Sequence, residues 1–299
     1  LSPASAGFYG LFHSVSAFCN AGFALFTGSL EPFSTNLLIN LVVTILIVAG
    51  GMSFVVLTDL WRLFRGRLGG SNRDRAKPLS VGTRAVLSVT GVALLLSFFL
   101  IYFLEHAASM KELPLGRQLL TTLFQTVTLR TAGFNTLPFD ELRTATYLAM
   151  MAFMFVGGAS GSTAGGIKVN SVAVIWSYLR SVRRGNRDAI LFRHRVSRNQ
   201  IGTAFSVLLF GVSAIFAATF ILSISEGFAL VEVLFESVSA FGTVGLSTGI
   251  TGGLTIVGRY VIIILMFIGR VGPLTLLSAS TSEERRLRVR YPTADISVG

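Results

Sequence analysis

The sequence has little cysteine and little charge. Cys19 is the only cysteine among the 299 residues, which excludes an intrachain disulfide framework and a cysteine-based metal site. Charged residues make up 13% of the chain, which is about half the share of an average soluble domain. Hydrophobic residues make up 52%, and the mean hydropathy is +0.70. A soluble core cannot absorb this much apolar surface, so we expect the lipid bilayer to be the solvent.

Five apolar stretches are long enough to cross a bilayer as helices, since a span needs about 20 residues. They cover residues 36–57, 84–104, 145–178, 201–225 and 255–279. Most of the 25 Lys and Arg residues gather in three segments between or after these stretches, at 62–84, 180–198 and 285–290. The positive-inside rule places those segments in the cytoplasm. The net charge of +11 therefore indicates membrane topology, and we expect no nucleic-acid partner.

The three remaining segments, 1–33, 105–143 and 226–254, face the opposite side and resemble one another. Each contains a short semi-apolar helix that leads to a glycine, namely Gly22, Gly133 or Gly245, and these glycines recur about every 110 residues. A fixed period indicates repeated supersecondary units. Each unit is interpreted as a span, a short pore helix, a glycine turn and a second span. The alternative is that glycine-rich turns merely connect the spans, but three matched loops on one side argue against it.

The glycine loops have the chemistry of an ion filter. Removing water from a potassium ion requires a ring of oxygens, which potassium channels supply from backbone carbonyls. Glycine permits the backbone conformations that turn carbonyls inward. The run Thr243-Val244-Gly245-Leu246 is close to the potassium-channel filter sequence. We therefore expect a potassium ion as substrate, no covalently bound cofactor, and a filter formed by Asn20, Ala21, Gly22, Thr131, Ala132, Gly133, Thr243, Val244 and Gly245.

The stretch 145–178 is too long for one crossing and is interrupted by five glycines between 157 and 166. A helix does not continue easily through so many glycines, and broken helices at mid-membrane are typical of ion sites and gates. The alternative is a small-residue helix-packing face, since 157–161 matches GxxxG. We expect a gate beneath the filter, formed by Gly157, Gly158, Ser160, Gly161, Ser162, Thr163, Gly165, Gly166, Lys168 and Arg270.

Three basic residues, Arg130, Lys168 and Arg270, fall at membrane depth, where charges usually have a function. Arg130 borders a filter glycine and either repels cations or, as we prefer, ties the filter to a carboxylate such as Glu236. Lys168 is expected to snorkel or to line the inner vestibule. Arg270 has glycines and a proline nearby, which predicts a kink that faces the pore.

Several of these motifs resemble the Trk/Ktr/HKT superfamily of potassium transporters. Residues 130–136 resemble its third pore loop, residues 157–168 its intramembrane gating loop, and residues 291–299 the end of the Ktr membrane subunit. The resemblance implies an all-α membrane protein with pseudo-fourfold repeats of helix, pore loop and helix around a central pore. It also implies potassium uptake in the plasma or inner membrane, a homodimer, and a cytoplasmic nucleotide-binding regulatory ring as partner.

The same resemblance divides the chain. It implies a partial second repeat at 1–60, a third repeat with a broken helix at 80–184, a fourth repeat at 199–284, and a cytoplasmic tail at 285–299. Only three pore loops are present, so an N-terminal truncation is expected, which lacks the first repeat and the first helix of the second.

Two rival functions remain to be weighed. A secondary transporter of another fold, coupled to sodium or protons, would also be rich in spans and glycine; sodium is a possible coupling ion in either case. Residues 158–161 match the GxSG of rhomboid intramembrane proteases, but that chemistry needs a histidine base at membrane depth. None of His13, His106 and His194 is suitably placed. We therefore expect a transporter and not an enzyme.

Overall fold

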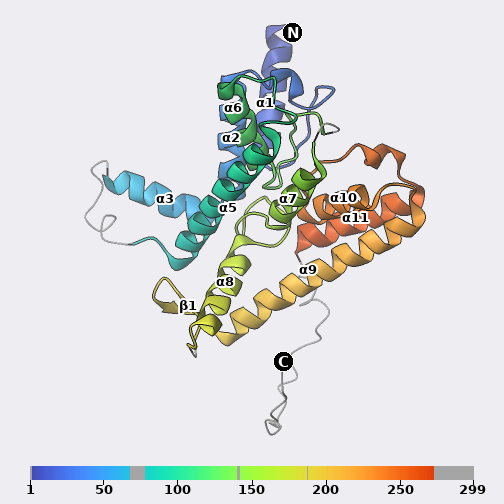
Figure 1. Ribbon diagram of the computed structural model, residues 1–299. Coiled ribbons are helices and arrows are strands. Elements are labelled where there is room, and N and C mark those ends of the chain that lie inside the picture. The colour runs from blue at the N-terminus through green and yellow to red at the C-terminus, as the bar shows by residue number, and fades with distance from the viewer. Residues whose placement is uncertain (1, 68–77, 140–141, 187, 273–299) are drawn as a thin grey trace.

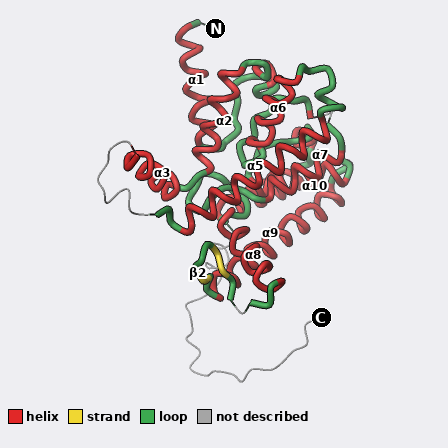
Figure 2. The backbone as a smooth tube through the Cα atoms, turned by 60° about the vertical axis from the view of Figure 1, so that its left-hand side comes forward, coloured by secondary structure: helices red, strands yellow, loops and turns green. Residues whose placement is uncertain are grey.

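The computed structural model describes residues 2–67, 78–139, 142–186 and 188–272, and this part of the chain is mostly helical (Figure 1). Within it, strands are confined to one small antiparallel hairpin, β1 (Ile190–Leu191) and β2 (His194–Arg195), next to α8 (Figure 2). A mostly helical fold agrees with the sequence prediction. The expected tail at 285–299, the motif at 291–299 and Pro273 lie outside the described residues.

The helices fall into three consecutive groups along the chain. The first group holds α1 (Pro3–Phe18), η1 (Glu31–Phe33), α2 (Leu37–Gly51) and α3 (Phe54–Arg67). The second holds α5 (Val81–Glu105), α6 (Leu115–Thr128), α7 (Thr144–Phe155) and α8 (Val169–Arg183). The third holds α9 (Arg198–Ser225), α10 (Leu230–Gly242), η3 (Ile250–Gly253) and α11 (Ile256–Val271). The short helices α1, α6 and α10 correspond to the predicted pore helices, and each ends shortly before one of the three matched glycines.

The spans differ in one place from the sequence prediction. Helices α5 and α9 are long and apolar enough to cross a membrane, and the stretch 145–178 is broken into α7 and α8 as expected. The stretch predicted as one span over 36–57 instead bends by 111° between α2 and α3. Met52 is extended there, and the Ser53 hydroxyl accepts a hydrogen bond from the Val56 amide, so it caps a new helix inside the apolar run. The kink predicted beside Arg270 stays a prediction, because α11 is helical to Val271 and Pro273 lies outside the described residues.

Lipid-facing and buried surfaces separate by element. Exposed large apolar side chains lie along the long helices, for example Leu96 and Phe103 on α5 and Phe216 and Ile224 on α9. By contrast, α10 is buried along most of its length and packs against α7, α9 and α11. Helix α10 is thus enclosed by apolar helices, whereas α1 keeps exposed apolar side chains such as Leu11 and Val15.

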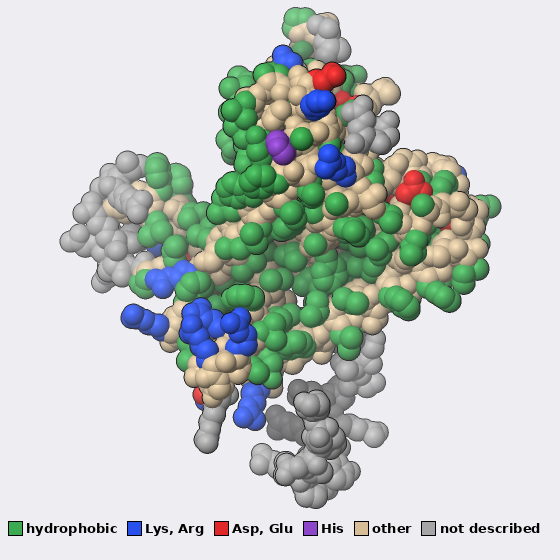
Figure 3. All heavy atoms as spheres, viewed as in Figure 1, with side chains coloured by type: hydrophobic (Ala, Val, Ile, Leu, Met, Phe, Trp, Pro, Cys, Tyr) green, Lys and Arg blue, Asp and Glu red, His purple; other side chains and the backbone are tan. Residues whose placement is uncertain are grey.

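Basic side chains gather at one end of the molecule. Figure 3 shows Lys and Arg concentrated around α8 and the hairpin, while the end with α1 and α6 carries both signs of charge. The Lys and Arg side chains at the basic end include Arg180, Arg183, Arg184, Arg193 and Arg195. This distribution agrees with a cytoplasmic location for that end.

Glycine brings an inner helix against a pore helix at two equivalent places. A Cβ built on Gly50 of α2 would lie 1.8 Å from the Phe18 carbonyl oxygen at the end of α1. A Cβ built on Gly269 of α11 would lie 1.8 Å from the Phe241 carbonyl oxygen in α10. Real carbon and oxygen atoms do not approach so closely, so these two helices contact the pore helices only because no side chain is present.

We predict that Gly269→Ala lowers the stability of the full-length protein, because the new methyl group must push α11 away from the rigid backbone of α10. Overpacking of this kind costs about 1–3 kcal/mol. The control is Gly91→Ala on α5, where nothing lies within 4 Å. That change should be neutral or stabilising by up to about 1 kcal/mol. Thermal unfolding in detergent measures both, and equal midpoints for the two variants would contradict the packing.

Candidate ion filter and intramembrane loop

The glycine turns after the three pore helices meet at one place. A Cβ built on Gly22 would lie 2.5 Å from the Ala132 carbonyl oxygen, and one built on Gly133 would lie 2.3 Å from the Val244 carbonyl oxygen. The Cβ built on Gly133 would also lie only 3.3 Å from the Cα atom of Gly22 and 3.2 Å from the Cα atom of Gly245. Three segments separated by about 110 residues in sequence therefore touch through their backbones. No other residue type fits at Gly22 or Gly133 without displacing a neighbouring loop.

The three turns share one backbone conformation. Left-handed φ angles occur at the glycine and at the residue two positions before it, with 51° and 73° at Asn20 and Gly22. The corresponding angles are 65° and 78° at Thr131 and Gly133, and 50° and 88° at Thr243 and Gly245. An extended strand points successive carbonyls to opposite sides, whereas a left-handed residue at every second position turns them toward one side. The conformation therefore suits a carbonyl-lined path.

Two threonines in these turns are unusual in both conformation and hydrogen bonding. A β-branched residue with positive φ is a genuine outlier, and strain of this kind is found mostly at functional sites. Both Thr131 and Thr243 have this strain, and the Oγ1 atom of each is buried without a hydrogen-bond partner among the described residues. Both hydroxyl oxygens are therefore unsatisfied within the described residues. The third equivalent position is Asn20.

The glycine-rich segment between α7 and α8 is a folded-back loop. The Gly157 amide donates to the Ile167 carbonyl at 2.9 Å, and the Ile167 amide donates to the Phe155 carbonyl at 3.2 Å. A Cβ on Gly157 would lie 1.8 Å from the Gly165 carbonyl oxygen, so the two limbs of the loop can meet only as glycines. Since the segment is not helical, the alternative of a GxxxG helix-packing face is excluded.

The loop is attached to the bend that follows α2. The Ala159 amide donates to the Gly51 carbonyl at 3.1 Å, and the Thr163 hydroxyl donates to the Gly50 carbonyl at 2.9 Å. These carbonyls belong to the last turn of α2, where no helical amide is left to bind them. The bend and the loop therefore satisfy each other's backbone groups, as membrane depth requires.

All three basic side chains that the sequence places at membrane depth donate hydrogen bonds to carbonyls of this loop. Arg130 donates to the Gly157 carbonyl at 3.1 Å, Lys168 donates through Nζ to the Ala164 carbonyl, and Arg270 donates to the Thr163 carbonyl. Irregular backbone leaves carbonyls unpaired, and a guanidinium or ammonium group supplies the missing donors. Arg270 is exposed, so its charge borders an accessible space, whereas Arg130 is buried.

The preferred partner of Arg130 was wrong. Glu236 accepts hydrogen bonds from the hydroxyls of Ser247 and Thr251, which follow α10 in its own repeat. Arg130 reaches the helix break instead of the neighbouring pore helix. The Glu236 carboxylate is hydrogen-bonded by hydroxyl side chains close to it in the sequence. A search of the sequence for opposite charges could not show this.

Direct contacts connect the loop to the filter turns. The Asn20 side chain donates to the Arg130 carbonyl at 3.0 Å, and its Oδ1 atom, 3.2 Å from the Thr163 hydroxyl, shares the single hydrogen of that hydroxyl with the Gly50 carbonyl. A Cβ on Gly165 would lie 2.2 Å from Thr243 Oγ1. The loop thus lies against the two turns that contain Asn20 and Thr243. Sequence reasoning placed Asn20 in the filter but did not find its role as a bridge, because an amide can bond in too many ways.

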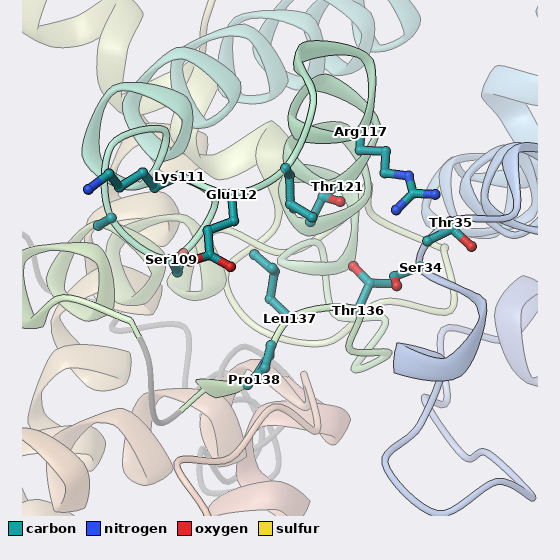
Figure 4. A pocket seen from close by; sticks show the side chains of 12 residues that line it. Ser34, Thr35, Ser109, Lys111, Glu112, Arg117, Thr121, Thr136, Leu137 and Pro138 are labelled. Atoms are coloured by element: carbon teal, nitrogen blue, oxygen red, sulfur yellow. The ribbon is translucent and has the colours of Figure 1, made fainter.

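A separate hollow of about 500 Å³ lies near the outer end of α6. Figure 4 shows Arg117 and Glu112 on opposite sides of it, with Thr121 and Thr136 between them. Its lining is polar and carries both charge signs. The hollow is lined by residues outside the three glycine turns, so it is distinct from the filter.

Membrane helices, re-entrant pore helices and converging glycine turns together define the class of pore-loop cation transport proteins. Residues 2–285 match the family model of TrkH, described as a cation transport protein, and the chain belongs to this family. It is therefore a membrane protein of a transporter family and not an enzyme. The sequence-based recognition of the Trk/Ktr relationship is confirmed.

Several curated relatives support the assignment. The chain is 36% identical to "Ktr system potassium uptake protein B" of Bacillus subtilis over 98% of its length, and 33% identical to "Potassium/sodium uptake protein NtpJ" of Enterococcus hirae over 97%. It spans 64% of the length of each of these relatives. The crystal structure of the potassium transporter TrkH from Vibrio parahaemolyticus superposes with a TM-score of 0.72, over 92% of this chain and 58% of that one, at 20% identity. This last likeness shows the fold.

We predict that Asn20→Gly destabilises the full-length protein. Glycine accepts the left-handed conformation, so the change isolates the two lost hydrogen bonds from backbone strain. It leaves the buried Arg130 carbonyl unpaired, which costs about 1–3 kcal/mol. Thermal unfolding in detergent gives the measurement, with Asn36→Gly as control, since Asn36 only caps α2 at an exposed position. A substitution at Asn20 that is no more harmful than the one at Asn36 would show that the bridge is unimportant.

Proposed function

We propose that this chain forms most of a potassium-uptake pore, in which carbonyls beside Gly22, Gly133 and Gly245 replace the water shell of the ion. One observation carries the proposal: three matched turns, far apart in sequence, touch through glycine and repeat the same left-handed pair of residues. Side-chain oxygens add to the carbonyls, since the hydroxyls of Thr131 and Thr243 have no other partner in the described structure. Oxygen ligands of this type suit an alkali cation.

Potassium is the proposed substrate because similar proteins carry it in their names, as "potassium uptake" or "potassium/sodium uptake" proteins. The second of these names keeps sodium open as a coupling or transported ion. The rival hypothesis of a secondary transporter with another fold is overturned by the family match. The part of that hypothesis that stays open is whether transport through the present fold is coupled to sodium or protons.

We further propose a pseudo-fourfold pore, of which the three described loops occupy three quadrants. The apolar face of α1 supports this arrangement, because Leu11, Val15 and Phe18 are exposed next to the first filter turn. In the proposed pore, a fourth quadrant of protein covers this surface and keeps water away from the carbonyls. The relatives, of which the chain spans 64%, have enough additional length for one more unit.

The partners are also a matter of proposal. A homodimer and a cytoplasmic nucleotide-binding ring are the partners that the family resemblance implies. The arginine cluster around α8 and the hairpin supports an acidic partner at the cytoplasmic end. The name "Ktr system" given to a similar protein is consistent with a transporter of more than one component.

We propose that the loop 157–166 and Arg270 gate this pore from below. The loop contacts the inner side of the filter turns at Asn20 and Thr243 and is held by the three basic side chains. A fixed positive charge in the path of a cation raises the barrier to its passage. Glycine density lets the loop move between positions without steric clashes of Cβ atoms. A partner that pulls on α8 would act on the loop directly, since α8 begins where the loop ends.

We predict that Gly133→Ser in the full-length transporter abolishes potassium uptake or admits sodium. The serine Cβ would lie 2.3 Å from the Val244 carbonyl oxygen and would have to adopt φ of 78°. Gly249→Ser is the matched control: its φ is 98°, but nothing lies within 4 Å. Uptake of potassium and sodium in cells that lack other potassium transporters measures the effect. Selective uptake at the normal rate by the Gly133 variant would refute the filter.

We predict that Arg270→Ala raises potassium flux and weakens its dependence on the cytoplasmic partner, because both a barrier charge and a loop anchor are lost. A change of at least about fivefold is expected from one lost charged hydrogen bond. Arg259→Ala on the same helix is the control, since its guanidinium reaches only the Gly252 carbonyl in the outer segment. Potassium flux into liposomes that contain each variant, with and without the cytoplasmic partner, measures the effect. Equal flux and intact regulation in both variants would mean that the gate lies elsewhere.

A further inference from the structure

One residue near the end of each pore helix makes the same two hydrogen bonds around its filter turn. The Ser16 carbonyl accepts from the Ala21 amide at 2.9 Å, and its hydroxyl donates to the Phe23 carbonyl at 2.9 Å. The Thr128 carbonyl accepts from Ala132 at 3.0 Å, and its hydroxyl donates to Phe134 at 2.7 Å. The Ser239 carbonyl accepts from Val244 at 2.8 Å, and its hydroxyl donates to Leu246 at 2.6 Å.

The two bonds always enclose the filter glycine, because they end on the residue before it and the residue after it. The middle turn is one residue shorter than the others between the helix and its glycine. Both bonds are nevertheless retained there. What is common to the three turns is therefore the position of the bonds relative to the glycine, and not a fixed number of residues.

These hydroxyls do not make the contact that is usual for their type. A serine or threonine inside a helix commonly donates back to the carbonyl four residues earlier. Ser237, on the same pore helix, does so by donating to Val233 at 2.9 Å. Ser239 is only two residues further, but its hydroxyl donates forward past the end of the helix. The three residues that donate these bonds are buried, with Ser16, Thr128 and Ser239 at most 5% exposed.

We propose that Ser16, Thr128 and Ser239 are positioning residues that set the outer limit of the filter, an inference that rests on the proposed function. Each hydroxyl holds the carbonyl after the glycine toward the pore helix, in the protein interior. That carbonyl is thereby directed away from the ion path, so the carbonyls that meet the ion end at the glycine. The spacing of the remaining carbonyls is fixed because the turn is bonded at both of its ends.

Selectivity is the property that should depend on these bonds. Without the hydroxyl, the carbonyl after the glycine is free to rotate, and the turn gains freedom at its outer end. A looser ring of oxygens discriminates less between ions of different radius. Loss of one buried hydrogen bond of about 1 kcal/mol corresponds to a change of about fivefold in the potassium-to-sodium uptake ratio. Total uptake need not fall.

The test uses two pairs of variants in the full-length transporter. Thr128→Val removes the hydroxyl and keeps the shape, and Thr126→Val is its control, because the Thr126 hydroxyl is buried on the same helix and has no partner in the described structure. Ser239→Ala is compared with Ser237→Ala in the same way. Thr128→Ser and Ser239→Thr keep a hydroxyl and should therefore keep the wild-type ratio of potassium to sodium uptake. Thermal unfolding confirms that each variant is folded.

We expect Thr128→Val and Ser239→Ala to lower the ratio of potassium to sodium uptake by about fivefold, with both controls and both hydroxyl-retaining variants unchanged. Equal ratios for test and control variants would overturn the inference. The result for Gly133→Ser distinguishes a failure of the proposed filter from a failure of the proposed role of the hydroxyls. If that variant remains selective, the proposed filter itself is wrong. If it loses selectivity while Thr128→Val and Ser239→Ala keep it, the filter stands and only the role of the hydroxyls is refuted.

Discussion

The structure depends on the contact of three backbone turns at a point where no Cβ fits. The spacing around Gly133 is too small for any side chain toward either neighbour. In a bilayer, backbone groups without partners are very costly, so turns can meet at this depth only if their polar groups have assigned partners. The rest of the fold provides those partners: helices lead into the turns, and a hydroxyl from each pore helix binds the carbonyl after each glycine. In the proposed filter, the remaining carbonyls bind the cation.

The same constraint explains the elements around the filter. Gly50 and Gly269 let the inner helices approach the pore helices, and the bend after α2 leaves carbonyls that bind the intramembrane loop. The loop in turn has carbonyls without helical partners, and the three basic side chains bind them. Arg130, Lys168 and Arg270 therefore act as hydrogen-bond donors to the backbone of the loop, and the proposed gating role rests on these contacts.

Much of this could be predicted from the sequence because it rests on strong and regular signals. Hydropathy and basic loops define helices such as α5 and α9, and the spacing of Gly22, Gly133 and Gly245 reveals the repeat. The failures came from short-range chemistry. A single hydroxyl at Ser53 starts a new helix inside an apolar run, and Ser247 and Thr251 satisfy Glu236 locally, so Arg130 binds elsewhere. The bracket around each glycine was missed because serine and threonine in a helix carry no signal of the direction in which they donate.

The filter and the loop form one connected unit. Asn20 joins the first turn to the second through the Arg130 carbonyl and to the loop through the Thr163 hydroxyl. A displacement of the loop would therefore remove a hydrogen bond from the filter itself. Through this connection, the proposed cytoplasmic partner would affect the proposed filter as well as the loop.

The most direct test of the central claim is to locate the ion. A structure of the full-length transporter in rubidium, with anomalous scattering recorded at the rubidium absorption edge, shows where a potassium-like cation binds. The account predicts a peak beside Gly22, Gly133 and Gly245, surrounded by carbonyl oxygens of the three turns. Rubidium bound elsewhere in the protein, with none at the meeting point of the glycines, would contradict it.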